Sequence, residues 1–167
     1  MSIFLREHYG EARLSARQIL KDPVLFLAFG FGSGLAKKMP GTLGTLAAIP
    51  LYLALQSTTS EIYALATVFS VLVGIYLCEI AARKLQVHDY GGIVWDEIAG
   101  LLLTLWGVPF SWQNLLLGFV LFRVFDIFKP WPIRWVDRHV AGGLGIMLDD
   151  VLAAGFAGSM LYITILI

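Results

Sequence analysis

The chain has 167 residues, which allows one domain, and 58% of them are hydrophobic while only 14% are charged. An ordinary soluble domain is roughly a quarter charged, so this composition and a mean hydropathy of +0.77 exclude that class and predict a multi-pass membrane protein. The formal net charge of zero gives no support for nucleic-acid binding, and the single cysteine, Cys78, excludes an internal disulfide.

Residues 1–22 carry charges of both signs, so we expect a polar N-terminal arm followed by a membrane-embedded domain over 23–167. The arm lacks the apolar core of a cleavable signal peptide. The apolar stretch 24–35 is shorter than the roughly 20 residues that span a bilayer. Its glycines and basic flanks favour a re-entrant or interfacial segment.

A glycine-containing turn follows at PGTLGT. Pro40 and Gly41 are typical of a turn, and Thr42 is expected to cap the next helix. Gly41, Gly44 and Thr45 could offer backbone N–H groups to a phosphate oxygen. No Gly-Lys-Ser/Thr follows, so the turn is not a Walker A loop.

The later apolar runs predict an all-α fold whose clearest membrane-spanning helix is 62–82, and a final run, 151–167, could just span. Glu79 is expected to reach the interface or to pair with Arg83, four positions on. The runs form two predicted helical hairpins, 42–60 with 61–82 and 98–110 with 111–128.

The basic residues indicate the orientation of these hairpins. The turns at 56–61 and 109–113 contain no Lys or Arg, and Arg123 is the one basic residue inside an apolar run. The hairpins therefore place all the basic segments on one face, which the positive-inside rule assigns to the cytoplasm. The same face receives the acidic motifs described next, so we expect a cytoplasmic-face site.

Two similar acidic motifs, GIVWDEIAG at 92–100 and GIMLDDVLA at 145–153, place Asp96, Glu97, Asp149 and Asp150 at two expected helix starts. Acids at helix N-termini are explained by the macrodipole alone. A second explanation is that the four carboxylates converge on a hard cation such as Mg²⁺, which takes oxygen ligands. Two such pairs at the membrane edge favour the metal.

A third group lies at the end of the run 114–128. Arg123 and Asp126 are three residues apart on one helical face, and a charged pair within an apolar run is a functional-site hypothesis by default. Lys129 extends that face. Arg134 and Arg138 suit an anionic substrate, although contact with lipid headgroups explains them equally well. The chemistry that remains is attack on a phosphoryl group by a metal-activated water or by a carboxylate.

In chain order, PGTLGTLAAIP, VHDYGGIVWDEIAG, FRVFDIFKPWPIRWVDR and GGLGIMLDDVLAAG resemble the bacterial phosphatidylglycerophosphatase A family, from about Pro23 to the C-terminus. The resemblance implies a small helical inner-membrane enzyme. It also implies Mg²⁺-dependent hydrolysis of the terminal phosphomonoester of a membrane lipid, phosphatidylglycerophosphate, to give phosphatidylglycerol and phosphate. The family's acidic and basic positions match Asp89, Asp96, Glu97, Asp126, Asp149, Asp150, Arg123, Lys129 and Arg134.

We assign hypothetical roles on this basis. Asp126 or Asp89 would orient or deprotonate the water. The metal ligands would be Asp96, Glu97, Asp149 and Asp150, and the substrate-binding residues would be Thr42, Arg123, Lys129, Arg134 and Arg138. The alternatives are a small cation or proton transporter that uses the carboxylates as a relay, which would need acids at several depths, and a structural membrane subunit whose acids only cap helices. The sequence leaves the oligomeric state open.

Overall fold

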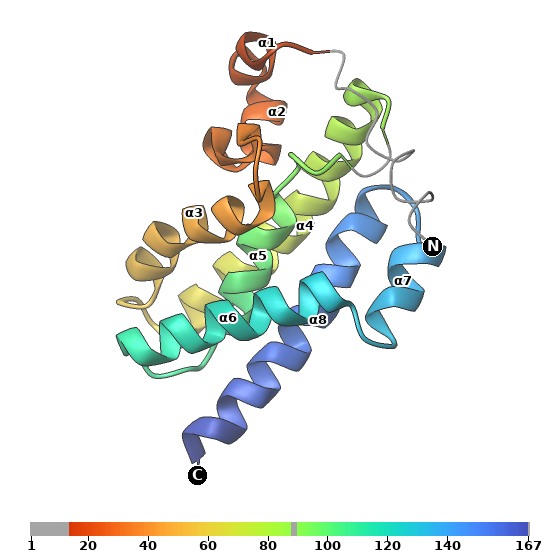
Figure 1. Cartoon of the computed structure of the whole chain (residues 1–167). Helices are drawn as coiled ribbons and strands as arrows, with labels where there is room; N and C mark the ends of the chain where they lie inside the picture. The colour runs from red at the N-terminus through yellow and green to blue at the C-terminus, as the bar shows by residue number, and fades with distance from the viewer. Residues whose placement is uncertain (1–13, 88–89, 167) are drawn as a thin grey trace.

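The computed structural model describes residues 14–87 and 90–166, and all regular secondary structure in these residues is helical, which confirms the predicted all-α fold. Figure 1 shows the arrangement. The elements are α1 Ala16–Lys21, α2 Pro23–Ala28, the 3₁₀ helix η1 Gly30–Leu35, α3 Pro40–Leu55, α4 Ser60–Leu85, α5 Trp95–Thr104, α6 Trp112–Phe128, α7 Ile133–His139 and α8 Gly142–Leu166.

Two helices of the described chain are long and apolar enough to cross a membrane. They are α4, with 26 residues, and α8, with 25. The predicted span 62–82 lies inside α4, and the final apolar run forms the C-terminal part of α8. The stretch 24–35 is divided between α2 and η1, with a kink at Phe31 and Gly32, whose φ angles are 59° and 94°. The number of membrane crossings and the side that faces the cytoplasm remain predictions.

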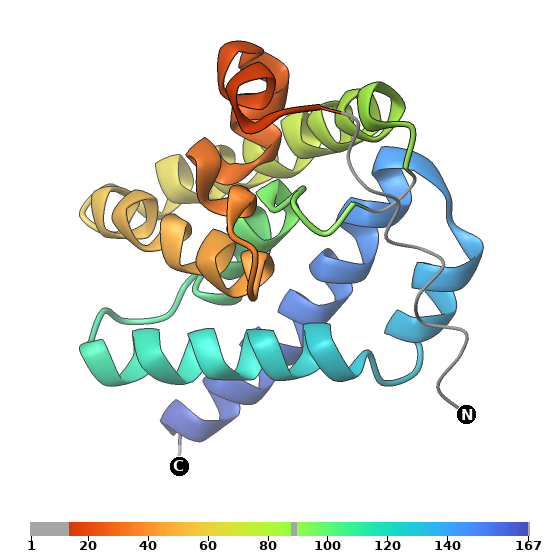
Figure 2. The ribbon, with the colours of Figure 1, turned by 45° about the horizontal axis from the view of Figure 1, so that its top comes forward.

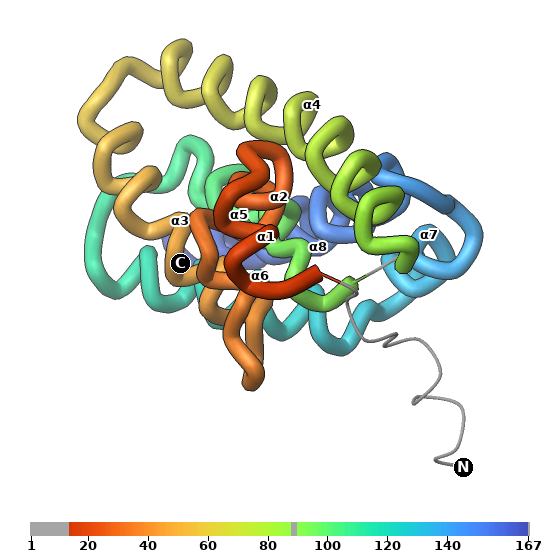
Figure 3. The backbone as a smooth tube through the Cα atoms, turned by 90° about the horizontal axis from the view of Figure 1, so that it is seen from above, coloured from red at the N-terminus to blue at the C-terminus, as the bar shows by residue number. Residues whose placement is uncertain are grey.

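The helix α5 forms the centre of the molecule. Ile98, Ala99 and Leu101 are fully buried, and α3, α4, α6 and α8 all contact this helix. Figure 3 shows α4 and α6 on opposite sides of α5. Figure 2 shows α6 crossing α8, which α6 also contacts. Because α5 ends at Thr104 rather than at residue 110, it is about 15 Å long, too short to span a bilayer.

The start of α3 differs from the expected one. The helix begins at Pro40, a position that suits proline because its fixed φ is already helical. Met39 is the N-cap residue, with φ 51°. Thr42 therefore lies within the first turn, and the prediction that it caps the helix is wrong. Gly44 and Thr45 also lie within the helix and are buried, so their N–H groups are not available to a ligand as we had expected.

The two acidic motifs also differ in their position on their helices. Asp96 and Glu97 lie in the first turn of α5, as predicted. The helix α8 begins at Gly142, so Asp149 and Asp150 lie about two turns inside it and not at its start. The prediction of a helix start at this second pair is therefore wrong. Helix capping accordingly cannot explain why this buried pair is present.

Candidate active site

A cavity of about 670 Å³ lies where the start of α3 meets α5, the end of α6, and α8. The loops that precede α3 and α5 complete its wall. The lining is rich in charge, with six carboxylates and three basic side chains among the described residues: Asp96, Glu97, Asp126, Asp137, Asp149, Asp150, Lys37, Arg123 and Lys129.

Three carboxylates in this cavity are arranged so that a cation could bind between them. Asp96, Glu97 and Asp150 each have an oxygen within 4.8 Å of the others. Glu97 Oε2 and Asp150 Oδ2 are buried and have no hydrogen-bond partner among the described residues. Buried carboxylate oxygens are costly unless they are protonated or bind a cation. These residues therefore fit Mg²⁺, which is bound by oxygen ligands.

The protonation of Glu97 supports this interpretation. Burial raises the pKa of Glu97 to about 8, and the nearby Asp150 and Asp126 carboxylates raise it further. A hydrogen bond with Asp96 and the charge of Arg123 lower this pKa but do not outweigh the burial. Without a cation, these surroundings thus favour the protonated form of the Glu97 carboxyl. A divalent cation that binds here would displace this proton, as is usual when a metal binds a protonated ligand.

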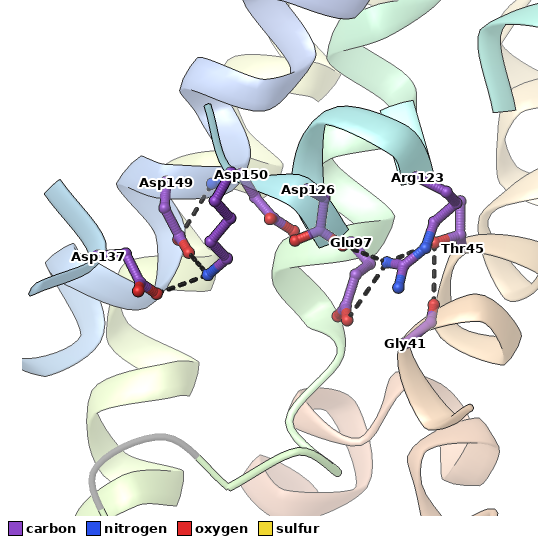
Figure 4. A network of polar contacts seen from close by, with 9 residues as sticks. Gly41, Thr45, Glu97, Arg123, Asp126, Asp137, Asp149 and Asp150 are labelled. Atoms are coloured by element: carbon purple, nitrogen blue, oxygen red, sulfur yellow. Dashed lines mark hydrogen bonds and ion pairs between the residues drawn. The ribbon is translucent and has the colours of Figure 1, made fainter. Parts of the chain in front are cut away.

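Arg123 forms the second part of the site. Its Nη1 lies 2.7 Å from Asp126 Oδ2 and 3.7 Å from Glu97 Oε1, so the predicted pairing of Arg123 with Asp126 is present. The same nitrogen donates to Thr45 Oγ1 at 3.5 Å, and Thr45 in turn donates to the Gly41 carbonyl at 2.9 Å (Figure 4). Arg123 Nε is buried and has no hydrogen-bond partner within the described chain.

Gly41 brings the N-terminus of α3 close to these groups. A Cβ atom at this position would overlap Glu97 Oε1 and would lie 3.1 and 3.2 Å from the two terminal nitrogens of Arg123. A larger residue at this position would therefore displace the ends of the Glu97 and Arg123 side chains. The first N–H bond of α3 runs from Leu43 to the Met39 carbonyl. The amides of Gly41 and Thr42 precede it and have no acceptor within the helix.

Lys129 forms the third part of the site. It is the C-cap residue of α6, and its Nζ donates to Asp137 Oδ1 at 2.6 Å and also to Asp149 Oδ2. Burial alone would lower the pKa of Lys129, but the charges of Asp149 and Asp137 outweigh this effect and raise it. Lys129 is therefore a permanent cation. Asp149 thus faces Lys129 while its neighbour Asp150 faces the carboxylate cluster (Figure 4).

The other expected site residues are placed differently. Thr42, Arg134 and Arg138 are not among the described residues that line the cavity, and Arg134 donates to the Phe128 carbonyl at 3.0 Å. Asp89 lies outside the described residues. The roles suggested for these four residues, and for Asp149 as a metal ligand, stay predictions.

Sequence reasoning gave no role to Asp137 or Lys37, although both line the cavity. Asp137 is eight residues from Lys129 and reaches it only because α7 folds back on the end of α6. No periodic pattern in the sequence indicates that contact. Lys37 precedes the glycine-containing turn, and its position in the basic pair Lys37-Lys38 was the one available signal.

Comparison with known proteins gives consistent results. A family model described as phosphatidylglycerophosphatase A matches residues 26–165. A phosphatidylglycerophosphatase A of Escherichia coli is 45% identical, with 88% of this chain and 86% of that protein covered. A protein of the same name from Haemophilus influenzae is 47% identical, with 83% and 86% covered. A Bacteroides thetaiotaomicron protein, whose name proposes phosphatidylinositol-3-phosphatase activity, is 36% identical, with 81% and 88% covered. No solved structure matches the chain.

Proposed function

This chain belongs to the phosphatidylglycerophosphatase A family, and we propose that it is a Mg²⁺-dependent enzyme that hydrolyses the terminal phosphomonoester of phosphatidylglycerophosphate. The products are phosphatidylglycerol and phosphate. One structural observation supports the proposal above all others: Asp96, Glu97 and Asp150 converge beside Arg123 in a cavity large enough for a lipid headgroup. The names of the relatives supply the substrate.

Mg²⁺ bound by Asp96, Glu97 and Asp150 would supply Lewis-acid activation of a water and neutralise charge on the phosphoryl group. Arg123 binds the phosphoryl oxygens through donors that Asp126 and Thr45 do not use. The amide of Gly41, which lines the cavity at the positive end of α3, adds to this anion site. These groups neutralise the negative charge that repels an attacking oxygen.

Asp126 is the carboxylate best placed to orient the attacking water and accept its proton, because Arg123 holds it in the cavity wall. The water oxygen bonds to phosphorus as the bond from phosphorus to the glycerol oxygen breaks, and the proton accepted by Asp126 is returned to that leaving oxygen. The sequence suggested Asp89 as the alternative base. Replacement of each aspartate by asparagine would separate the two roles, since only the base should change the pH dependence of turnover.

We further propose that the enzyme is a multi-pass protein of the bacterial inner membrane whose cavity opens on the cytoplasmic face. The lengths of α4 and α8 and the distribution of Lys and Arg support this orientation. A transporter would need carboxylates at several depths, whereas here the described carboxylates of the cavity gather in one place. The lipid phosphatase is therefore the function that we propose.

The decisive experiment measures phosphate release from phosphatidylglycerophosphate by the detergent-purified protein, with Mg²⁺ and with EDTA. We expect release that requires Mg²⁺ and is lost in Asp150→Asn, which removes one charge from the cluster without changing its size. Glu61→Gln is the matched control, because Glu61 lies exposed in the first turn of α4. Release that persists in EDTA would contradict the metal. No release from a folded wild-type sample would contradict the phosphatase.

A further inference from the structure

The cavity is larger than a single phosphate group requires. Its volume of about 670 Å³ is within the range of roughly 300–1,000 Å³ that encloses a drug-sized ligand. The anion site at Arg123 and the start of α3 uses only one part of the wall. The remaining space therefore accommodates further parts of a ligand. The side chains around this space indicate the chemistry of those parts of the ligand.

Lys37 is the basic residue of the lining that has no carboxylate partner within the described chain. Arg123 pairs with Asp126 and Glu97, and Lys129 binds Asp137 and Asp149. Lys37 is exposed, so it lies at the edge of the cavity rather than in its interior. A cation at the edge of a cavity whose interior is acidic favours a second anionic group on the ligand.

The segment that carries Lys37 is held in a defined position. The backbone of Gly34 packs against that of Gly92, where a Cβ would lie 2.8 Å from the Gly34 carbonyl oxygen. The Ala36 amide donates to the Ser33 carbonyl at 3.2 Å. Lys37 thus precedes the start of α3 by three residues, and both Lys37 and Gly41 line the cavity. Lys37 therefore lies on the wall of the same cavity as Arg123.

We propose that Lys37 binds the phosphodiester of the lipid substrate while the phosphomonoester lies at Arg123, an inference that rests on the proposed function. Phosphatidylglycerophosphate carries both groups, separated by a three-carbon glycerol. Met39, two residues after Lys37, also lines the cavity and is 66% exposed, so the side of the cavity that holds the diester also offers an apolar contact to the lipid tails.

The names of the relatives agree with separate sites for a phosphodiester and a phosphomonoester. Phosphatidylglycerophosphate and phosphatidylinositol 3-phosphate, the substrates in those names, both carry a phosphodiester next to the lipid and a phosphomonoester further out on a polyol. Phosphatidic acid carries a phosphomonoester directly on the diacylglycerol and has no diester. Lys37 therefore determines specificity for lipids that have both groups.

The test compares Lys37→Gln with Lys38→Gln in detergent micelles at varied lipid mole fraction. Lys38 is the adjacent exposed lysine and is not among the described lining residues, so both variants lose the same surface charge. For phosphatidylglycerophosphate, we expect Lys37→Gln to lower kcat/KM about tenfold through KM, the size expected for one lost hydrogen bond to a charged group. Hydrolysis of phosphatidic acid should not change, and Lys38→Gln should resemble the wild type.

Equal activity of Lys37→Gln and wild type on phosphatidylglycerophosphate would overturn the inference. An equal fall on both lipids, or the same fall in Lys38→Gln, would overturn it as well. Binding of phosphatidylglycerol, which keeps the diester and lacks the monoester, gives a reading without turnover, and Lys37→Gln should weaken it about tenfold. Inorganic phosphate should inhibit both proteins alike, because it reaches only the Arg123 site.

These experiments distinguish a failure of the proposed phosphatase activity from a failure of the proposed role of Lys37. If wild-type protein releases no phosphate from phosphatidylglycerophosphate, the proposed function fails, and the phosphatidylglycerol binding still decides the role of Lys37. If the wild type releases phosphate and Lys37→Gln binds phosphatidylglycerol as tightly as wild type, the role of Lys37 alone fails.

Discussion

At the residue scale, Thr45 shows how a side chain that cannot touch the substrate can still determine the geometry of the site. Its hydroxyl is fully buried, donates to the Gly41 carbonyl at 2.9 Å and accepts from Arg123 Nη1 at 3.5 Å. The hydroxyl therefore connects the start of α3 to the guanidinium. We consider Thr45 a positioning residue for Arg123.

We expect Thr45→Val to lower kcat/KM about fivefold, because the variant keeps the shape of the side chain but removes the acceptor for Arg123. The effect is modest since a 3.5 Å hydrogen bond is long. Thr45→Ser should retain activity because it keeps the hydroxyl. Phosphate release measured for the three proteins checks this. Equal impairment of the serine and valine variants would show that packing of the methyl group, and not the hydrogen bond, matters.

The contacts that could be predicted from the sequence at this scale are those within one helix. Glu79 pairs with Arg83 at 2.6 Å and Arg123 with Asp126 at 2.7 Å, because residues three or four apart share a helical face. The different surroundings of Asp149 and Asp150 could not be predicted in this way. Adjacent helical residues point about 100° apart, so which one faces the cluster depends on how α8 packs.

At the element scale, the start of α8 is fixed by its contact with α4. The Gly143 amide donates to Glu79 Oε2 at 2.6 Å, and Glu79 Oε1 accepts from Arg83 Nε. A carboxylate at this end of a helix is favoured by the macrodipole. A Cβ at Gly143 would lie 2.6 Å from the Glu79 backbone nitrogen, so the two helices touch backbone to backbone. This contact sets where Asp150 lies in the cavity.

We expect Gly143→Ala to lower the free energy of unfolding by about 1–3 kcal/mol, since the added methyl group overpacks this contact, and to reduce Mg²⁺-dependent turnover by moving α8. Gly155→Ala on the same helix is the control. No described atom lies within 4 Å of a Cβ at Gly155, and alanine favours a helix over glycine. Thermal unfolding in detergent checks both variants. Equal unfolding of Gly143→Ala and wild type would contradict the close contact.

The helix ends were the least predictable part of the fold. The glycines of GGLG indicate a turn, yet α8 begins inside that sequence at Gly142. Packing explains the difference, since a Cβ at Gly143 would overlap the Ile75 carbonyl and one at Gly145 would overlap the Val140 carbonyl. The glycines are present for close approach, and tertiary contacts override their low helix propensity. The two similar acidic motifs therefore lie at different positions on their helices, at the start of α5 and inside α8.

At the scale of the whole molecule, large apolar side chains cover the outside of the helices as well as the core. Leu65 on α4 is 70% exposed and Leu116 on α6 is 65% exposed, whereas Leu101 on α5 is fully buried. Exposed apolar surface of this kind marks a membrane or protein interface. Lipid-facing and core positions are both apolar, so the sequence could predict a membrane protein but not which face of each helix lies inside.

The orientation in the membrane gives the last prediction. The helix α4, with 26 residues, is about 39 Å long, which exceeds the roughly 30 Å of a hydrocarbon core. In the proposed topology, its start at Ser60 and its end at Leu85 lie on opposite sides of the membrane. The turn before Ser60 contains no basic residue, whereas Lys37, Lys38, Arg83 and Lys84 flank the other end of the α3–α4 hairpin. The positive-inside rule thus places Thr58 outside and Lys38 in the cytoplasm.

Single cysteines test this orientation in a Cys78→Ala background, because Cys78 is the one cysteine of the chain and is buried. A membrane-impermeant maleimide applied to intact bacterial spheroplasts should label Thr58→Cys and leave Lys38→Cys unlabelled, and lysis should expose both. Labelling of Lys38→Cys from outside would place the cavity on the opposite face. A phosphatase with that orientation would meet only lipid of the outer leaflet, so this result would contradict the cytoplasmic site even if the purified enzyme were active.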